Sequence, residues 1–256
     1  MKTFILCGGL GTRLDYEGKV HAKPMVRIGN KPILIHIIEN FCAQGFNKFV
    51  LCLGYNSKSI VNYFVNEKNN NVKVINRKSK SIKIRHKSKI LNFEADLVFT
   101  GINSGTGGRI KFAYEYLNLN EDFLMTYGDG LSNISIKNLL KFHYKKKAKV
   151  TIAAVRPKQR YGVLKIIADK VSYFDNSKKK TDVYINGGYH VISKQAVSKI
   201  KDMKTYWEKE PLNYFKNKNF LFAFKHEGFW KSLDTLKDKN DFNLLYKQKK
   251  YLWKLK

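Results

Sequence analysis

The sequence predicts an α/β protein with a Rossmann-like, doubly wound mixed sheet and a β-rich C-terminal elaboration. Short apolar runs bounded by glycine, as at residues 3–7 and 49–53, have the length and composition of buried parallel strands. Segments with helical spacing of apolar residues follow them, at 32–44 and 57–65. This strand–helix alternation is typical of a doubly wound sheet, and after residue 156 the pattern becomes rich in strands.

The first helix, residues 32–44, is bounded by Pro32 in its first turn and Gly45 just past its end. Asn56 or Ser57 suits the cap of the second helix. Residues 72–90 alternate polar and apolar side chains, which predicts exposed strands on an insertion. The core then continues with strands at 95–99, 123–127 and 150–155 and with helices at 107–117 and 136–147.

The C-terminal part is expected to hold four strands and one helix. The strands are predicted at residues 163–168, 171–174, 183–192 and 220–224, and the helix at 235–245. No linker rich in Pro, Gly or Ser divides the chain, so we expect a single domain over residues 1–256, with a core at 1–156 and a second part at 157–256.

The composition bounds the function without identifying it. A net charge of +29 suggests nucleic acid as a partner, but the lysines are scattered, and no zinc finger, aromatic–basic strand or bZIP-like region occurs. A solvated basic surface, or a field that attracts polyanionic substrates, explains the charge better. No apolar run of roughly 20 residues predicts a membrane span. The absence of signal-peptide features and the three cysteines in apolar runs favour a cytoplasmic protein with buried thiols.

A glycine-rich loop follows the first predicted strand, and such a loop lets backbone amides approach phosphate oxygens. Arg13 adds a planar donor group that matches phosphate geometry. Leu14 stands where the dinucleotide fingerprint needs its third glycine, and no Gly-Lys-Ser/Thr follows as in a Walker A loop. The candidate phosphate-binding residues of this loop are Gly8, Gly9, Gly11, Thr12 and Arg13.

Two further residues extend this candidate site. Lys23 precedes Pro24, which predicts an extended backbone that can direct the ammonium toward phosphates held by the loop. Asp129 lies between two glycines at the end of a predicted buried strand, where open α/β sheets bind ligands. A carboxylate at that position can hold Mg²⁺, which prefers hard oxygen ligands and is usually bound by one or two carboxylates and substrate phosphates. A turn aspartate is the alternative interpretation.

The order of motifs resembles the sugar-1-phosphate nucleotidyltransferases and, among them, the glucose-1-phosphate cytidylyltransferases. The glycine loop followed by Lys-Pro-Met-Val at residues 23–26 is similar to the general signature of these enzymes. The narrower resemblance rests on Thr-Gly-Gly-Arg at 106–109, Thr-Tyr-Gly-Asp-Gly at 126–130, Ile-Asn-Gly-Gly at 185–188, Trp-Glu-Lys-Glu-Pro-Leu at 207–212, Gly-Phe-Trp at 228–230 and Leu-Asp-Thr-Leu at 233–236.

This resemblance implies transfer of CMP from CTP to a sugar 1-phosphate, foremost α-D-glucose 1-phosphate, with release of pyrophosphate. It also implies Mg²⁺ as cofactor, a homo-oligomer, and a role in nucleotide-sugar synthesis for cell-surface polysaccharide. Arg13, Lys23 and Asp129 are then catalytic, and Asp129 and Asp234 bind the metal, although Asp234 alone also suits a helix cap. The implied contacts are Thr106, Gly107 and Gly108 for the base, where small residues leave room, and Tyr161, Gly162, Asn186, Gly187 and Glu210 for the sugar.

Two positions depart from the family pattern. Ser177 falls where the family carries the lysine that binds the sugar phosphate, and Lys178 could replace it only through a loop rearrangement. Arg27 stands where a glutamate is common. A different phosphorylated acceptor and a non-catalytic nucleotide-binding protein therefore remain alternatives, with nucleic-acid binding third. His86 and His190 show no evident partner in the sequence and are interpreted as ordinary polar residues.

Overall fold

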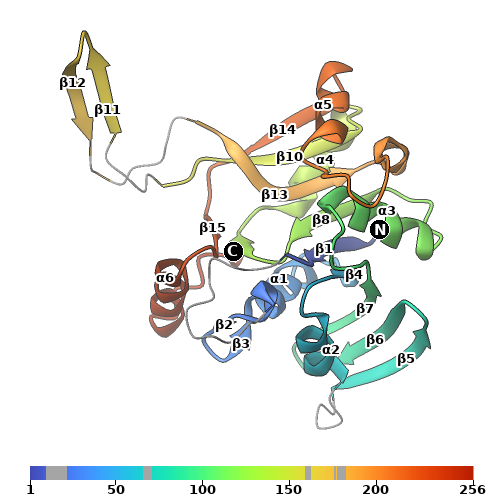
Figure 1. The fold of residues 1–256 in the computed structure, drawn as a ribbon. Helices are drawn as coiled ribbons and strands as arrows, with labels where there is room; N and C mark the ends of the chain where they lie inside the picture. Colours follow the sequence, from blue (N-terminus) through green and yellow to red (C-terminus); the bar gives the residue numbers. More distant parts are fainter. Residues whose placement is uncertain (10–21, 66–70, 159–162, 176, 178–182, 256) are drawn as a thin grey trace.

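The computed structural model describes residues 1–9, 22–65, 71–158, 163–175, 177 and 183–255. Within these ranges a nine-stranded mixed sheet runs through the molecule in the order β14-β10-β13-β8-β1-β4-β7-β6-β5 (Figure 1). Its strands are β1 (Thr3–Cys7), β4 (Lys48–Leu53), β5 (Val72–Lys78), β6 (Ser81–Lys87), β7 (Asn92–Phe99), β8 (Phe123–Tyr127), β10 (Val150–Val155), β13 (Ile185–Ile192) and β14 (Leu221–His226).

The centre of the sheet is parallel. Strand β1 pairs in parallel with β4 on one side and with β8 on the other. The chain therefore continues from β1 to β4 on one side of the sheet and later returns to β8 on the other side. The carboxyl ends of β1 and β8 form a topological switch point, where such sheets bind ligands. Strand β13 is antiparallel to β8 and pairs Tyr189 with Thr126, so its first residues lie beside the end of β8.

Helices cover both faces of the sheet. This is expected because successive side chains of the buried strand β1 point to opposite faces. Ile5 and Cys7 pack into one apolar cluster with α1 (Ile33–Cys42), α2 (Ser57–Val65), α4 (Ile136–Lys145) and α6 (Leu236–Lys247). Phe4 and Leu6 pack into the other with α3 (Thr106–Tyr116), the 3₁₀ helix η3 (Lys194–Lys199) and α5 (Glu210–Asn217). This three-layer arrangement confirms the predicted fold class.

Two predictions about the strands need correction. Strands β5 and β6 are not an exposed insertion but the antiparallel edge of the main sheet, with Ile82 and Ile84 buried against β7. In the C-terminal part, β13 and β14 also belong to the main sheet, and β14 lies parallel to β10. The helices α5 and η3 were missed because polar and lysine-rich segments obscure their short apolar faces.

One hairpin is separate from the sheet. Strands β11 (Val163–Ile167) and β12 (Lys170–Asp175) pair only with each other and stand away from the body in Figure 1. Leu164 opposes Phe174 and Ile166 opposes Val171, so these four side chains share one face. Each of the four is at least half exposed, so the described part of the chain leaves this face uncovered.

No helix in the described ranges is long and apolar enough to cross a membrane. Cys7 and Cys52 are buried as expected, whereas Cys42 is only half-buried. Burial raises the pKa of the Cys52 thiol to about 12, so it is a neutral packing group at physiological pH.

Candidate active site

A lysine shared by two carboxylates lies at the switch point. The Lys23 ammonium donates to Asp129 Oδ2 and to Asp234 Oδ1, each at 2.7 Å. All three side chains are partly exposed, with 17% of Lys23, 30% of Asp129 and 25% of Asp234 accessible, so a ligand can reach them. The structure therefore brings together three of the predicted site residues from distant parts of the chain.

Short strands bring the two aspartates together. Asp129 directly precedes β9 (Gly130–Ser132). Strand β9 pairs with β15 (Trp230–Ser232), and β15 ends two residues before Asp234. The Leu233 amide also donates to the Asp129 carbonyl at 2.8 Å. Asp234 is not a helix cap, because Thr235 caps α6 in a capping box with Asp238. Its carboxylate instead accepts from Ser232 and Lys23, so it is held in the site.

The electrostatics keep this cluster charged. Burial alone lowers the pKa of Lys23, but Asp129 and Asp234 outweigh it and raise the pKa above the ordinary value. Burial also acts to raise the pKa of Asp234, whereas hydrogen bonds from Lys23 and Ser232 bring it below the ordinary value. At neutral pH Lys23 is therefore a charged ammonium and Asp234 a carboxylate that accepts from it.

The backbone at Lys23 differs from the prediction. Residues Lys23–Met25 form a 3₁₀ turn with Pro24 in its first positions, not an extended segment. Pro24 is buried against the end of β8, where a side chain on Gly128 would come within 2.7 Å of the Pro24 Cγ. The glycine before Asp129 thus makes room for the turn that presents Lys23.

Arg109 is a buried residue beneath the start of the glycine loop. Its guanidinium donates to the Gly8 carbonyl at 3.2 Å and to Thr100 and Gly101 at 2.8 and 2.6 Å. A Cβ on Gly8 or on Gly54 would overlap this group. The ends of β1, β4 and β7 are therefore joined by one cation that bonds to neutral oxygens.

The Thr-Gly-Gly segment opens α3 as expected, but its glycines serve another purpose. A Cβ on Gly107 would approach the Thr205 carbonyl to 2.9 Å, and one on Gly108 would overlap the Met203 carbonyl. The small residues therefore make room for the protein's own 203–205 backbone, and their contact with a base stays a prediction. Thr106, by contrast, has a side chain that lies between Glu208 and the Trp207 amide.

The Asn-Gly-Gly segment lies next to the aspartate loop. Gly188 has a φ of +80° and packs against the Tyr127 ring, which ends β8. The Trp230 indole donates to the Gly187 carbonyl at 2.7 Å, so the Gly-Phe-Trp motif joins this turn to β15. Asn186 itself is exposed beside the switch point.

The acidic residue that contacts this region is Glu208. Its carboxylate accepts from the Tyr127 hydroxyl and from Thr106 Oγ1. Glu210, the residue that the resemblance indicated, begins α5 and is exposed, and both of these hydrogen bonds go to Glu208 instead. The sequence signal that could have found Glu208 is its place in the same Trp-Glu-Lys-Glu motif, two residues earlier.

Several predicted residues fall outside the described ranges. They are Gly11, Thr12, Arg13, Tyr161, Gly162 and Lys178. Ser177 is described and exposed. Among the described residues, no group of three or more His, Cys, Asp or Glu side chains is placed to hold a metal by itself.

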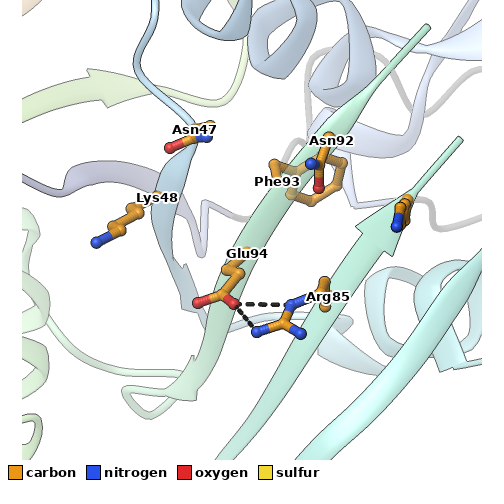
Figure 2. A pocket seen from close by; sticks show the side chains of 7 residues that line it. Asn47, Lys48, Arg85, Asn92, Phe93 and Glu94 are labelled. Atoms are coloured by element: carbon orange, nitrogen blue, oxygen red, sulfur yellow. Dashed lines mark hydrogen bonds and ion pairs between the residues drawn. The ribbon is translucent and has the colours of Figure 1, made fainter. Parts of the chain in front are cut away.

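A pocket occurs at the opposite end of the sheet (Figure 2). It lies where β4 and β7 begin, and Glu94 in it forms a double hydrogen bond with Arg85 of β6. Its other lining residues are Asn47, Lys48, Lys87, Asn92 and Phe93. None of the predicted site residues lines it.

Comparison with known proteins identifies the family. Residues 2–239 match the family of nucleotidyl transferases. Over 254 residues the chain is 39% identical to the glucose-1-phosphate cytidylyltransferase of Salmonella typhimurium, covering 99% of each protein. It is 34% identical over its whole length to a probable glucose-1-phosphate cytidylyltransferase of Bacillus subtilis.

Solved structures confirm the fold. The crystal structure of HddC from Yersinia pseudotuberculosis superimposes with a TM-score of 0.70 at 24% identity, over 96% of this chain and 99% of that one. The switch-point site, the full-length relatives and this shared fold agree. The chain is an enzyme that belongs to the nucleotidyl transferase family, on the branch of the glucose-1-phosphate cytidylyltransferases.

Proposed function

We propose that the protein transfers CMP from CTP to α-D-glucose 1-phosphate and releases pyrophosphate. A phosphate oxygen of the sugar phosphate attacks the α-phosphorus, a new P–O bond forms, and the bond to the β-phosphate breaks. The observation that carries the proposal is the Lys23–Asp129–Asp234 cluster at the carboxyl ends of β1 and β8, where a triphosphate would bind. The choice of CTP as the nucleotide and of glucose 1-phosphate as the acceptor rests on the similarity to the relatives.

We further propose that Asp129 and Asp234 bind Mg²⁺. The two carboxylates already share one cation, the Lys23 ammonium, at 2.7 Å from each, so they are spaced to hold a single positive charge jointly. Two carboxylates plus substrate phosphates form the oxygen donor set that Mg²⁺ prefers. The ion would neutralise phosphate charge in this site.

The chain's own residues account for binding and orientation. Lys23 places positive charge beside the carboxylates, where the phosphates gather, and Arg13 in the glycine loop adds a second cation by the family resemblance. We also propose that residues 1–156 supply the nucleotide site and residues 157–256 the acceptor site, with Asn186 and Gly187 facing the acceptor.

A substrate panel tests this function. Pyrophosphate release is measured with Mg²⁺, each of CTP, UTP, ATP, GTP and dTTP, and several sugar phosphates led by α-D-glucose 1-phosphate. We expect fast turnover with CTP and glucose 1-phosphate and much slower turnover with the other pairs. Turnover with a different acceptor only would support a different cytidylyltransferase, which the Ser177 position favours as the second candidate. CTP binding without turnover on any acceptor would indicate a non-catalytic protein.

The replacement of Lys178 by alanine tests how the acceptor phosphate is bound. If Lys178 takes the role of the lysine absent at position 177, the variant will show a KM for glucose 1-phosphate raised about tenfold or more, as expected for a lost charge-assisted hydrogen bond. Lys180→Ala, in the same lysine run, is the matched control. An unchanged KM in Lys178→Ala would exclude this role.

We propose that the protein is a homo-oligomer and that the β11–β12 hairpin forms part of its interface. A two-stranded hairpin is marginally stable alone, and the apolar face of Leu164, Ile166, Val171 and Phe174 needs cover. Two identical hairpins related by a two-fold axis would cover each other. The edge strand β6 suits an interface less well, because Ile82 and Ile84 are buried against the protein's own sheet.

Light scattering after size exclusion tests this interface. The wild-type protein is expected to elute as an oligomer, and Phe174→Lys is expected to shift it toward the mass of one 29.8 kDa chain. Ile75→Lys, an exposed apolar residue on the edge strand β5, is the control and should leave the oligomer intact. A monomeric wild-type protein would contradict the proposal.

A further inference from the structure

A network of hydrogen bonds connects the interior with the acceptor side of the site. The Trp207 indole donates to His190 Nδ1 at 3.2 Å, and His190 Nε2 lies 3.2 Å from Asn186 Oδ1. Trp207 and His190 are buried, whereas Asn186 is exposed at the switch point. The network therefore extends from the core to a side chain that a ligand can reach.

The chemistry of these groups determines where each proton lies. An indole nitrogen can only donate, so His190 Nδ1 must accept and the ring proton of the neutral imidazole is on Nε2. Burial lowers the pKa of His190 to about 3, which keeps the ring neutral. His190 Nε2–H then donates to Asn186 Oδ1, which also accepts from the Gly188 amide at 2.8 Å.

The orientation of the Asn186 carboxamide follows. Both lone pairs of its oxygen are occupied by protein donors, so the two N–H groups of its nitrogen are left to donate. One of them donates to the Tyr127 hydroxyl, which itself donates to Glu208, so the second N–H is the group left to face the site. Asn186 is thus restricted to one of its two amide orientations.

We propose that His190 is a positioning residue for the acceptor: it holds Asn186 with its nitrogen directed to a hydroxyl or phosphate oxygen of the bound sugar phosphate. This inference rests on the proposed function, because it takes Asn186 as a contact of the acceptor. An oxygen-rich ligand accepts from the amide nitrogen, whereas the reversed amide would present a second acceptor and repel it. His190 acts through Asn186 and does not itself touch substrate.

The kinetic test compares two substitutions of similar bulk. His190→Phe removes both ring nitrogens, and His190→Gln keeps a donor near the position of Nε2. We expect His190→Phe to raise the KM for glucose 1-phosphate about tenfold with the KM for CTP changed less than twofold, and His190→Gln to recover most of the loss. In an Asn186→Ala background, His190→Phe should add less than twofold. Equal effects of the two substitutions, or effects that add fully to Asn186→Ala, would overturn the proposal.

A second measurement does not depend on turnover. In ¹⁵N-histidine-labelled protein, the ring signals lost in His190→Phe identify this residue among the six histidines. The expected shifts are those of a neutral ring protonated at Nε2 from pH 5 to pH 8. A charged ring or a proton on Nδ1 would overturn the proposal even in an active enzyme. An inactive wild-type protein with the expected shifts would instead count against the proposed function alone.

Discussion

Asp129→Asn is expected to lower kcat with CTP and glucose 1-phosphate about 10³-fold while the protein stays folded. The substitution keeps the shape of the side chain but removes the charge that, with Asp234, surrounds the Lys23 ammonium. Loss of a metal-binding carboxylate removes several kcal/mol of transition-state stabilisation, and each ~1.4 kcal/mol is a factor of ten in rate. Steady-state rates of pyrophosphate release measure the effect.

The matched control is Glu94→Gln. Glu94 is also a carboxylate in an ion pair on a parallel strand, but it lies in the pocket at the opposite end of the sheet (Figure 2). Its removal breaks an exposed pair with Arg85, and such pairs contribute little. We expect near-wild-type turnover from Glu94→Gln. Full activity in Asp129→Asn would exclude the role of Asp129 in binding the metal.

Arg109→Met is expected to destabilise the fold by about 3 kcal/mol or more, because several buried acceptors lose their donor at ~1–3 kcal/mol each. For a chain of this size such a loss corresponds to a drop in Tm of roughly 6–12 °C. Thermal unfolding followed by circular dichroism measures it. CTP binding should weaken as well, since Gly8 begins the glycine loop and bonds to the lost guanidinium.

Lys111→Met controls for the loss of a cation from the same helix. Lys111 lies two residues further along α3 and donates to the carbonyls of Ile200 and Lys201 near the surface. Because water can replace this donor, we expect a loss of less than about 1 kcal/mol. Equal destabilisation by the two substitutions would show that Arg109 has no special role beneath the loop.

The sequence alone was sufficient for the parallel core. Short apolar runs such as residues 3–7 have the length and composition of buried strands, and strand–helix alternation predicts a parallel core. The pairing of β1 with β4 and β8 was seen only in the structure. The same local signals failed at β5 and β6, where an alternating pattern is typical both of an exposed hairpin and of a sheet edge. Only the tertiary contact with β7 distinguishes these two cases.

The candidate site divides in the same way. Asp129 was predictable because a glycine-flanked aspartate ends a strand, and Lys23 because it follows the loop. The sequence could not predict the contacts of Glu208, the burial of Arg109 or the contact of His190 with Trp207. Each of these depends on segments that are distant in the chain. Likewise, the sequence could not show that Gly107 and Gly108 also make room for the 203–205 backbone.

The most direct test of the account is the identity of the product. The wild-type protein is incubated with CTP, α-D-glucose 1-phosphate and Mg²⁺, and the nucleotide products are identified by mass spectrometry alongside the measured pyrophosphate. We expect CDP-glucose in a one-to-one ratio with pyrophosphate. Unchanged CTP in the presence of this acceptor, or conversion to CMP without a nucleotide sugar, would contradict it.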